Sequence, residues 1–138
     1  MCGIIAYLGK NAGSKIALEG IHLLRNRGYD SVGCCSQNPK TRKLVITKYA
    51  TINDENNGYN RLEQSYDRHE EATCLAMHTR WATTGRVSDE NSHPHLDTLT
   101  NSIALVHNGI INNYLELKEF LQQHGVKFNS ETDTEVIV

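Results

Sequence analysis

The chain of 138 residues has no run of apolar residues near the ~20 that a membrane-spanning helix needs. Its first residues also lack the basic segment that opens a secretory signal. The net charge is −2, without the basic excess typical of nucleic-acid-binding proteins. We therefore expect a cytoplasmic protein that binds neither membrane nor nucleic acid, with a length that suits one domain.

The four cysteines do not form a C-x-x-C pair. Because nothing indicates secretion, we expect Cys34, Cys35 and Cys74 to be buried, reduced thiols. Of the seven histidines, only His93 and His95 have a close, same-face spacing. A zinc site needs three or four convergent ligands, and no third partner is evident. We predict no metal and no other cofactor.

Short apolar segments predict the β-strands. The first, CGIIAYL, is a nearly continuous apolar run, typical of a strand that is covered on both faces. The predicted strands are 2–8, 30–36, 43–49, 74–78 and 102–107. A Gln-Asn-Pro-Lys turn joins the second and third into a hairpin. The polar segment 81–100 is long for a loop, and loops of that length are usually functional.

Helical periodicity separates these strands. One helix follows Ser14, a candidate N-cap, and another covers 114–121. The charged segment 51–72 carries only a thin apolar stripe, which predicts a surface helix. Near the end of the chain, Thr132 and Glu135 have the spacing of a capping box and predict one more helix. The sequence contains no internal repeat and no low-complexity segment.

The most informative residue is Cys2. Met1 is normally excised before a small residue, and its removal would make Cys2 the N-terminal residue. The thiol, with a pKa of about 8.5, would then share a Cα with an amine of pKa about 7.7–8.0. Such an amine can act as the base for its own side chain. Position alone also fits a buried cysteine at the start of an apolar strand.

Several short segments next to predicted strands carry further chemistry. They are Cys2-Gly3-Ile4, Arg27-Gly28-Tyr29-Asp30-Ser31, His78-Thr79-Arg80-Trp81-Ala82-Thr83, Asn91-Ser92-His93-Pro94-His95, His107-Asn108-Gly109 and Ser130-Glu131-Thr132-Asp133-Thr134-Glu135. In this order and register they resemble the class II glutamine amidotransferases. The fullest match is to the glutaminase domain of the glutamine–fructose-6-phosphate aminotransferase family. The amidophosphoribosyltransferase and asparagine synthetase branches share the Cys-Gly start and the Asn-Gly, but they fit the intervening segments less well.

The resemblance implies an α+β fold, the four-layer αββα sandwich of N-terminal nucleophile hydrolases. Residues 1–138 would form a partial glutaminase domain, roughly its first half, without the sugar isomerase domains of that family. We expect a chain that retains Met1 to be inactive, because acylation removes the α-amine base. The full-length enzyme is expected to be a homodimer.

The resemblance also assigns catalytic roles. Cys2 would attack the side-chain amide of L-glutamine, form a γ-glutamyl thioester and release ammonia. The Asn108 side chain and the Gly109 N–H would form the oxyanion hole. Arg27 would help to organise the nucleophile end. Taken alone, Asn108-Gly109 also fits a plain turn after a strand.

Five further residues would bind glutamine. Arg80 would bind the α-carboxylate and Asp133 the α-ammonium. The simpler alternative for Arg80 is a surface salt bridge. For Asp133 it is an acidic residue favoured in the first turn of a helix. Thr83 would add a hydroxyl to the carboxylate. Trp81 would lie on a mobile loop that closes over the substrate. The alternative explanation for this residue is ordinary aromatic packing in the core. Thr84 stands where the family normally has histidine, which matters only if the family uses the ring rather than the backbone.

The acceptor of the ammonia is implied by the resemblance alone. In the full-length enzyme it would be fructose 6-phosphate, and the product glucosamine 6-phosphate. Two alternatives stay open. The chain could be the glutaminase domain of another amidotransferase, such as amidophosphoribosyltransferase, or a catalytically inactive, truncated glutamine-binding module.

Overall fold

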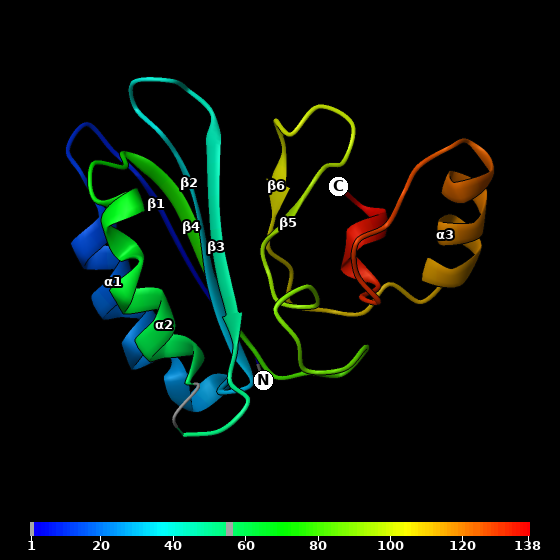
Figure 1. Cartoon of the computed structure of the whole chain (residues 1–138), viewed down its shortest axis with the longest axis horizontal. Helices are drawn as coiled ribbons and strands as arrows, with labels where there is room; N and C mark the ends of the chain where they lie inside the picture. Colours follow the sequence, from blue (N-terminus) through cyan, green and yellow to red (C-terminus); the bar gives the residue numbers. More distant parts are fainter. Residues whose placement is uncertain (1, 55–56) are drawn as a thin grey trace.

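An antiparallel four-stranded sheet with the strand order β1-β4-β2-β3 lies at the centre of the fold (Figure 1). The computed structural model describes residues 2–54 and 57–138. The strands are β1 Gly3–Leu8, β2 Ser31–Gln37, β3 Leu44–Ala50 and β4 Cys74–Arg80. β4 pairs with both β1 and β2, and β2 pairs with β3 across the predicted hairpin. The first four predicted strands are confirmed, and β4 continues two residues further than expected.

Two helices cover one face of this sheet, α1 (Ser14–Leu23) and α2 (Gly58–Gln64) (Figure 1). Each is followed by a 3₁₀ turn, η1 (Arg25–Arg27) after α1 and η2 (Tyr66–His69) after α2. The predicted N-cap is wrong by one residue. Gly13 occupies the cap position, and the Ser14 hydroxyl instead donates to the Glu70 carbonyl at 2.6 Å.

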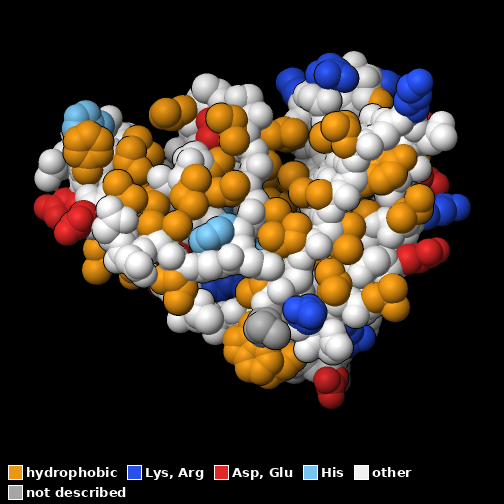
Figure 2. Space-filling view, turned by 180° about the vertical axis from the view of Figure 1, so that it is seen from behind, with side chains coloured by type: hydrophobic (Ala, Val, Ile, Leu, Met, Phe, Trp, Pro, Cys, Tyr) orange, Lys and Arg blue, Asp and Glu red, His pale blue; other side chains and the backbone are white. Residues whose placement is uncertain are grey.

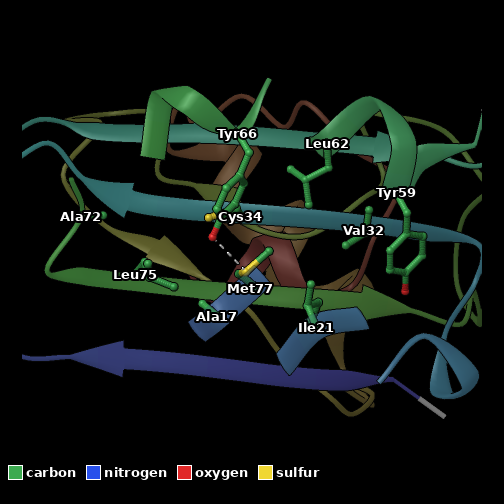
Figure 3. Packing of buried hydrophobic residues seen from close by; sticks show 10 residues of the cluster. All are labelled: Ala17, Ile21, Val32, Cys34, Tyr59, Leu62, Tyr66, Ala72, Leu75 and Met77. Carbon is green, nitrogen blue, oxygen red and sulfur yellow. Dashed lines mark hydrogen bonds between the residues drawn. The ribbon is translucent and has the colours of Figure 1, made fainter. Parts of the chain in front are cut away.

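The main apolar core lies between these helices and the sheet (Figure 3). It contains Ala17, Ile21, Val32, Cys34, Tyr59, Leu62, Tyr66, Ala72, Leu75 and Met77. The predicted surface helix in 51–72 is present but short, because α2 covers only Gly58–Gln64. Its apolar stripe packs inward, with Tyr59 and Leu62 each only 1% exposed. The polar side chains of Asn60, Glu63 and Gln64 are exposed on the other face of α2.

A smaller second sheet and a third helix lie on the other face (Figure 1). The sheet pairs β5 (His95–Leu96) with β6 (Ala104–Leu105), and α3 (Tyr114–Gln123) lies beyond it with the 3₁₀ turn η3 (Thr134–Val136). The layers thus follow the order helix, sheet, sheet, helix. The predicted strand 102–107 is shorter than expected, and the predicted loop 81–100 contains β5.

The predicted capping box is wrong. Its helix is the single 3₁₀ turn η3, and the cap position has no side-chain hydrogen bond. The Thr132 hydroxyl bonds to His95 Nε2 at 2.9 Å, so it is not available as a cap. The Glu135 carboxylate accepts N–H bonds from Asn129 and Ser130 at 2.8 and 2.7 Å. The Thr132 and Glu135 side chains therefore stabilise the loop before η3, and they do not cap a helix.

Apolar side chains remain exposed around the second sheet and α3. Ile103, Leu115 and Phe120 are 59%, 66% and 57% exposed, and Figure 2 shows such apolar side chains over the face opposite the view of Figure 1. The expectation that these residues form about half of a larger sandwich stays a prediction. None of the helices within residues 2–54 and 57–138 combines the length and apolar character needed to span a bilayer.

The cysteines follow the prediction in part. Cys34 and Cys35 are buried and reduced, and burial raises the pKa of both thiols. Cys74 is exposed, contrary to the prediction. It begins β4 at the end of the sheet, opposite Leu8, which is itself 83% exposed. Leu75 and Met77 of β4 belong to the core under the helices, so Cys74 points to the opposite face of the sheet.

We predict that Leu62→Ala lowers the free energy of unfolding by about 2–5 kcal/mol, because it leaves a cavity in the core. Leu23→Ala is the matched control, since Leu23 is 81% exposed and its removal is expected to cost less than about 0.5 kcal/mol. Equilibrium denaturant unfolding measures both. Equal losses in the two variants would contradict this assignment of the core.

Candidate active site

The start of β1 and the end of β4 bring Cys2 to one end of the central sheet. The register pairs Gly3 with Thr79, so Cys2 lies beside the end of β4. The Gly3 N–H donates to the Thr79 hydroxyl at 3.0 Å, and the Trp81 N–H donates to Cys2 Sγ at 3.2 Å. A Cβ on Gly3 would stand 3.0 Å from Leu24 Cβ, so a small residue suits the position after the cysteine. The thiol is half-buried.

Cys2 borders a small cavity of about 30 Å³, room for roughly one water molecule. Its other lining residues are His78, Arg80, Trp81, Thr83, His93, His107, Gly109, Asp133 and Thr134. The structure thus gathers most of the predicted site residues from four separate segments of the chain. Glutamine is larger than this space, so bound glutamine would either extend beyond it or displace lining residues.

Asn108 and Gly109 follow β6 and lie next to Cys2. The Asn108 Nδ2 group donates to the Cys2 carbonyl at 3.2 Å, while Asn108 Oδ1 lies 2.9 Å from His78 Nε2. A Cβ on Gly109 would stand 2.5 Å from the His107 ring, so a larger residue here would displace that ring. Within residues 2–54 and 57–138, no group accepts a hydrogen bond from the Gly109 N–H. Two N–H donors are therefore present beside the thiol.

Arg80, the last residue of β4, is only 4% exposed. Its guanidinium donates to the carbonyl oxygens of Thr84 and Arg86, in the latter case at 3.5 Å. Thr84 therefore contacts Arg80 through its backbone. Its side chain is not needed for that bond, so a threonine in place of histidine leaves the contact intact.

The Arg-Gly-Tyr-Asp-Ser segment supports the backbone around Arg80. A Cβ on Gly28 would stand 2.7 Å from the Arg80 carbonyl carbon, so only glycine allows this close approach. The Asp30 N–H donates to the Arg80 carbonyl at 3.1 Å, and the Asp30 carboxylate accepts the Ala82 N–H at 2.8 Å. Arg27 itself is exposed and does not line the cavity.

Asp133 lies on the cavity wall and is 5% exposed. Its carboxylate accepts the Ile111 N–H at 2.7 Å. Nearby, the Asn91 side chain exchanges two hydrogen bonds of 2.8 Å with Glu131, one through the Glu131 N–H and one through its carboxylate. This pair ties the segment that carries Asp133 to the loop after β4. Sequence reasoning missed this role, although both residues lie inside the recognised segments.

Trp81 and Thr83 lie on the loop after β4. Trp81 is 44% exposed and packs edge-on against Tyr29, with ring centroids 5.3 Å apart. The alternative that Trp81 packs in the core is therefore wrong. Thr83 is exposed at the cavity rim.

Three buried histidines form a group at the cavity, and two of them, His78 and His93, line it. Sequence reasoning noted the spacing of His93 and His95 but not the contact with His78. His78 stacks on His93 with ring centroids 4.3 Å apart, and His93 meets His95 edge-on at 4.7 Å. Burial lowers the pKa of His78 to about 4 and that of His95 to about 3, and it lowers the pKa of His93 further. Among the described residues, no three potential ligands converge as a metal site would require.

The sequence of residues 60–138 matches the model of a family described as "Glutamine amidotransferase domain". Two curated relatives are named glutamine–fructose-6-phosphate aminotransferase (isomerizing), one from Aquifex aeolicus and one from Clostridium tetani. Each is 44% identical to 99% of this chain, which covers 22% and 21% of their respective lengths. The chain therefore spans about a fifth of the length of these relatives.

Two solved structures share the fold. The glutamine phosphoribosylpyrophosphate amidotransferase from B. subtilis has a TM-score of 0.75 at 24% identity. A structure described as the allosteric regulatory enzyme of purine biosynthesis has a TM-score of 0.76 at 27% identity. Each alignment covers 99% of this chain and 28% of the other chain.

We predict that the free energy of unfolding falls as the pH is lowered from about 7 toward 4. Burial lowers the pKa of His69 and His78 to about 4 and of His95 to about 3, whereas a histidine in an unfolded chain titrates near 6.5. Below that pH the unfolded chain binds protons that the folded chain does not. Each of these histidines then lowers the free energy of unfolding by roughly 1.4 kcal/mol per pH unit, until the pH reaches the pKa that the histidine has in the folded chain.

Urea unfolding across this pH range measures the slope. His69→Gln keeps an amide that can bond to the Ser36 and Thr47 hydroxyls, which His69 contacts at 2.7 and 2.9 Å, and it is expected to reduce the slope. A stability that does not change between about pH 7 and 5 would contradict the assignment of these histidines as neutral.

Proposed function

From the premise that the chain belongs to the glutamine amidotransferase domain family, we propose that it hydrolyses the side-chain amide of L-glutamine with Cys2 as an N-terminal nucleophile. The observation that carries the proposal is that Cys2 lies on one cavity with Gly109 and that the Asn108 amide donates to the Cys2 carbonyl oxygen. That cavity also contains a buried cation, Arg80, and a buried anion, Asp133. A free amino acid carries the two complementary charges.

The proposed reaction needs no group beyond those of the chain and water. Once Met1 is removed, the α-amine of Cys2 takes the thiol proton and the sulfur attacks the amide carbon. The Asn108 Nδ2 group and the Gly109 N–H stabilise the oxygen as it becomes negative. The protonated amine then gives its proton to the leaving nitrogen, and ammonia departs. Water, deprotonated by the same amine, cleaves the thioester and releases glutamate.

Substrate recognition would depend on charge pairing in a largely buried site. Arg80 would bind the α-carboxylate as a planar fork, with the Thr83 hydroxyl beside it. Asp133 would receive the α-ammonium. Because glutamine is larger than the space in this cavity, we propose that the loop that carries Trp81, Thr83 and Thr84 moves when glutamine binds. Arg27 lies outside the cavity, so any support from it would pass through the adjacent Gly28 and its packing on Arg80.

We also propose fructose 6-phosphate as the acceptor of the ammonia in a longer chain that carries this domain. The support is the identity of 40–44% over 99% of this chain to several enzymes named as aminotransferases of that sugar phosphate. The structural neighbour named as a phosphoribosylpyrophosphate amidotransferase is only 24% identical, so that acceptor is the lesser alternative. A cytoplasmic location and a homodimer belong to the same proposal.

The nucleophile is tested by glutamate release and by labelling with 6-diazo-5-oxo-L-norleucine, an electrophilic analogue of glutamine. We predict that a chain beginning at Cys2 hydrolyses glutamine and gains one adduct on Cys2, found by peptide mass spectrometry. Cys2→Ala is expected to remove both properties. Cys74→Ser is the matched control, because Cys74 is an exposed thiol away from the cavity, and it is expected to keep both.

A chain that retains Met1 is expected to be unreactive, because its Cys2 has no free amine. Glutamine binding without hydrolysis by the chain that begins at Cys2 would contradict the proposal. That result would favour the inactive glutamine-binding module instead.

The carboxylate site is tested by Arg80→Lys. A lysine keeps the charge but loses the fork, and we predict that KM for glutamine rises about 10- to 100-fold while kcat changes less. Arg68→Lys serves as the control, because Arg68 is exposed in η2. Steady-state kinetics of glutamate release measure both variants. An unchanged KM in Arg80→Lys would remove Arg80 from substrate binding.

A further inference from the structure

We propose that His78 is a positioning residue that fixes the orientation of the Asn108 amide toward Cys2. This inference rests on the function proposed above and adds a residue to it. His78 lies in β4 and is 1% exposed. Its Nε2 atom lies 2.9 Å from Asn108 Oδ1 and 3.2 Å from the His107 carbonyl oxygen.

The His107 carbonyl determines which ring nitrogen of His78 carries the proton. A backbone carbonyl oxygen can only accept hydrogen bonds, so His78 Nε2 must be an N–H donor. His78 Nδ1 is buried and has no hydrogen-bond partner among the described residues. A second proton on Nδ1 would therefore have no acceptor, in surroundings that already disfavour charge. The ring is neutral, with its hydrogen on Nε2.

This tautomer decides how the Asn108 amide lies. The His78 N–H requires an acceptor, so the amide oxygen must turn toward His78 and the NH₂ group toward Cys2. In that orientation one N–H donates to the Cys2 carbonyl at 3.2 Å, and the second N–H stays available for the developing oxyanion. A flipped amide would instead place a carbonyl oxygen near the oxyanion, where like charges repel.

The packing around His78 holds its ring in place. His93 stacks on it with the ring planes 16° apart, and the His107 N–H donates to His93 Nδ1 at 3.3 Å. The loop that carries His93 reaches the sheet because of Gly33 in β2, where a Cβ would stand 2.1 Å from the His93 carbonyl oxygen. The donor to Asn108 therefore belongs to the rigid sheet rather than to a loop.

The test compares two substitutions in the chain that begins at Cys2. His78→Phe keeps a flat ring for the stack but has no N–H, whereas His78→Gln places an amide N–H close to the Nε2 position. We expect His78→Phe to lower kcat for glutamine hydrolysis about 10- to 100-fold with KM nearly unchanged, because the oxyanion contact forms only in the transition state. His78→Gln is expected to recover most of that loss.

A double-mutant cycle with Asn108→Ala separates positioning from a general structural effect. In the Asn108→Ala background, His78→Phe is expected to cause no further loss of kcat. An equal loss in both backgrounds, or a His78→Gln variant no better than His78→Phe, would overturn the proposal. A wild-type chain that does not hydrolyse glutamine would instead count against the proposed function.

The orientation can also be tested without turnover. We expect ¹⁵N NMR of the His78 ring to show a protonated Nε2 and a bare Nδ1 between about pH 7 and 5, because burial lowers the pKa of His78 to about 4. A proton on Nδ1 in this range would overturn the inference whether or not the chain is active.

Discussion

The antiparallel pairing of β1 with β4 is the constraint on which the site depends. It joins residues that are 76 positions apart, through Gly3 opposite Thr79, and so sets Cys2 beside Arg80. A shift of one residue in this register would turn every β4 side chain to the opposite face of the sheet. The backbone hydrogen bonds between β1 and β4 therefore set the relative positions of the Cys2 thiol, the Arg80 guanidinium and the His78 ring.

The loops around the site pack against the end of the sheet that carries Cys2 and Arg80. They do so at glycines, which have no side chain, and through hydrogen-bonded pairs of polar side chains. Gly28 and Gly33 allow backbone to lie directly on Arg80 and His93. The Asn91–Glu131 pair then ties the loop after β4 to the segment with Asp133. These buried polar groups act through precise hydrogen bonding and contribute little apolar packing. The apolar core lies on the opposite face, between the sheet and the helices α1 and α2 (Figure 1), so stability and chemistry are separated across the sheet.

Much of the fold follows from the sequence, because continuous apolar runs specify β1, β2, β3 and β4 without help from distant residues. The apolar stripe of 51–72 also predicts the buried face of α2, with Tyr59 and Leu62, but it does not show that the helix covers only Gly58–Gln64. Every residue that lines the cavity lies in one of the recognised segments, whereas Arg27, Thr84 and Asn108 do not line it. The segments could not show that Thr84 contacts Arg80 through its carbonyl, or that His78 orients Asn108, because these contacts depend on backbone direction and on the protonation of one ring nitrogen.

The central claim is that Cys2 forms a thioester with glutamine, and the most direct measurement is acid-quenched mass spectrometry of a chain that begins at Cys2. After brief mixing with glutamine, the account predicts a γ-glutamyl adduct on the N-terminal peptide that disappears as glutamate accumulates. Glutamate release with no adduct at any mixing time, and at an equal rate in Cys2→Ala, would contradict it.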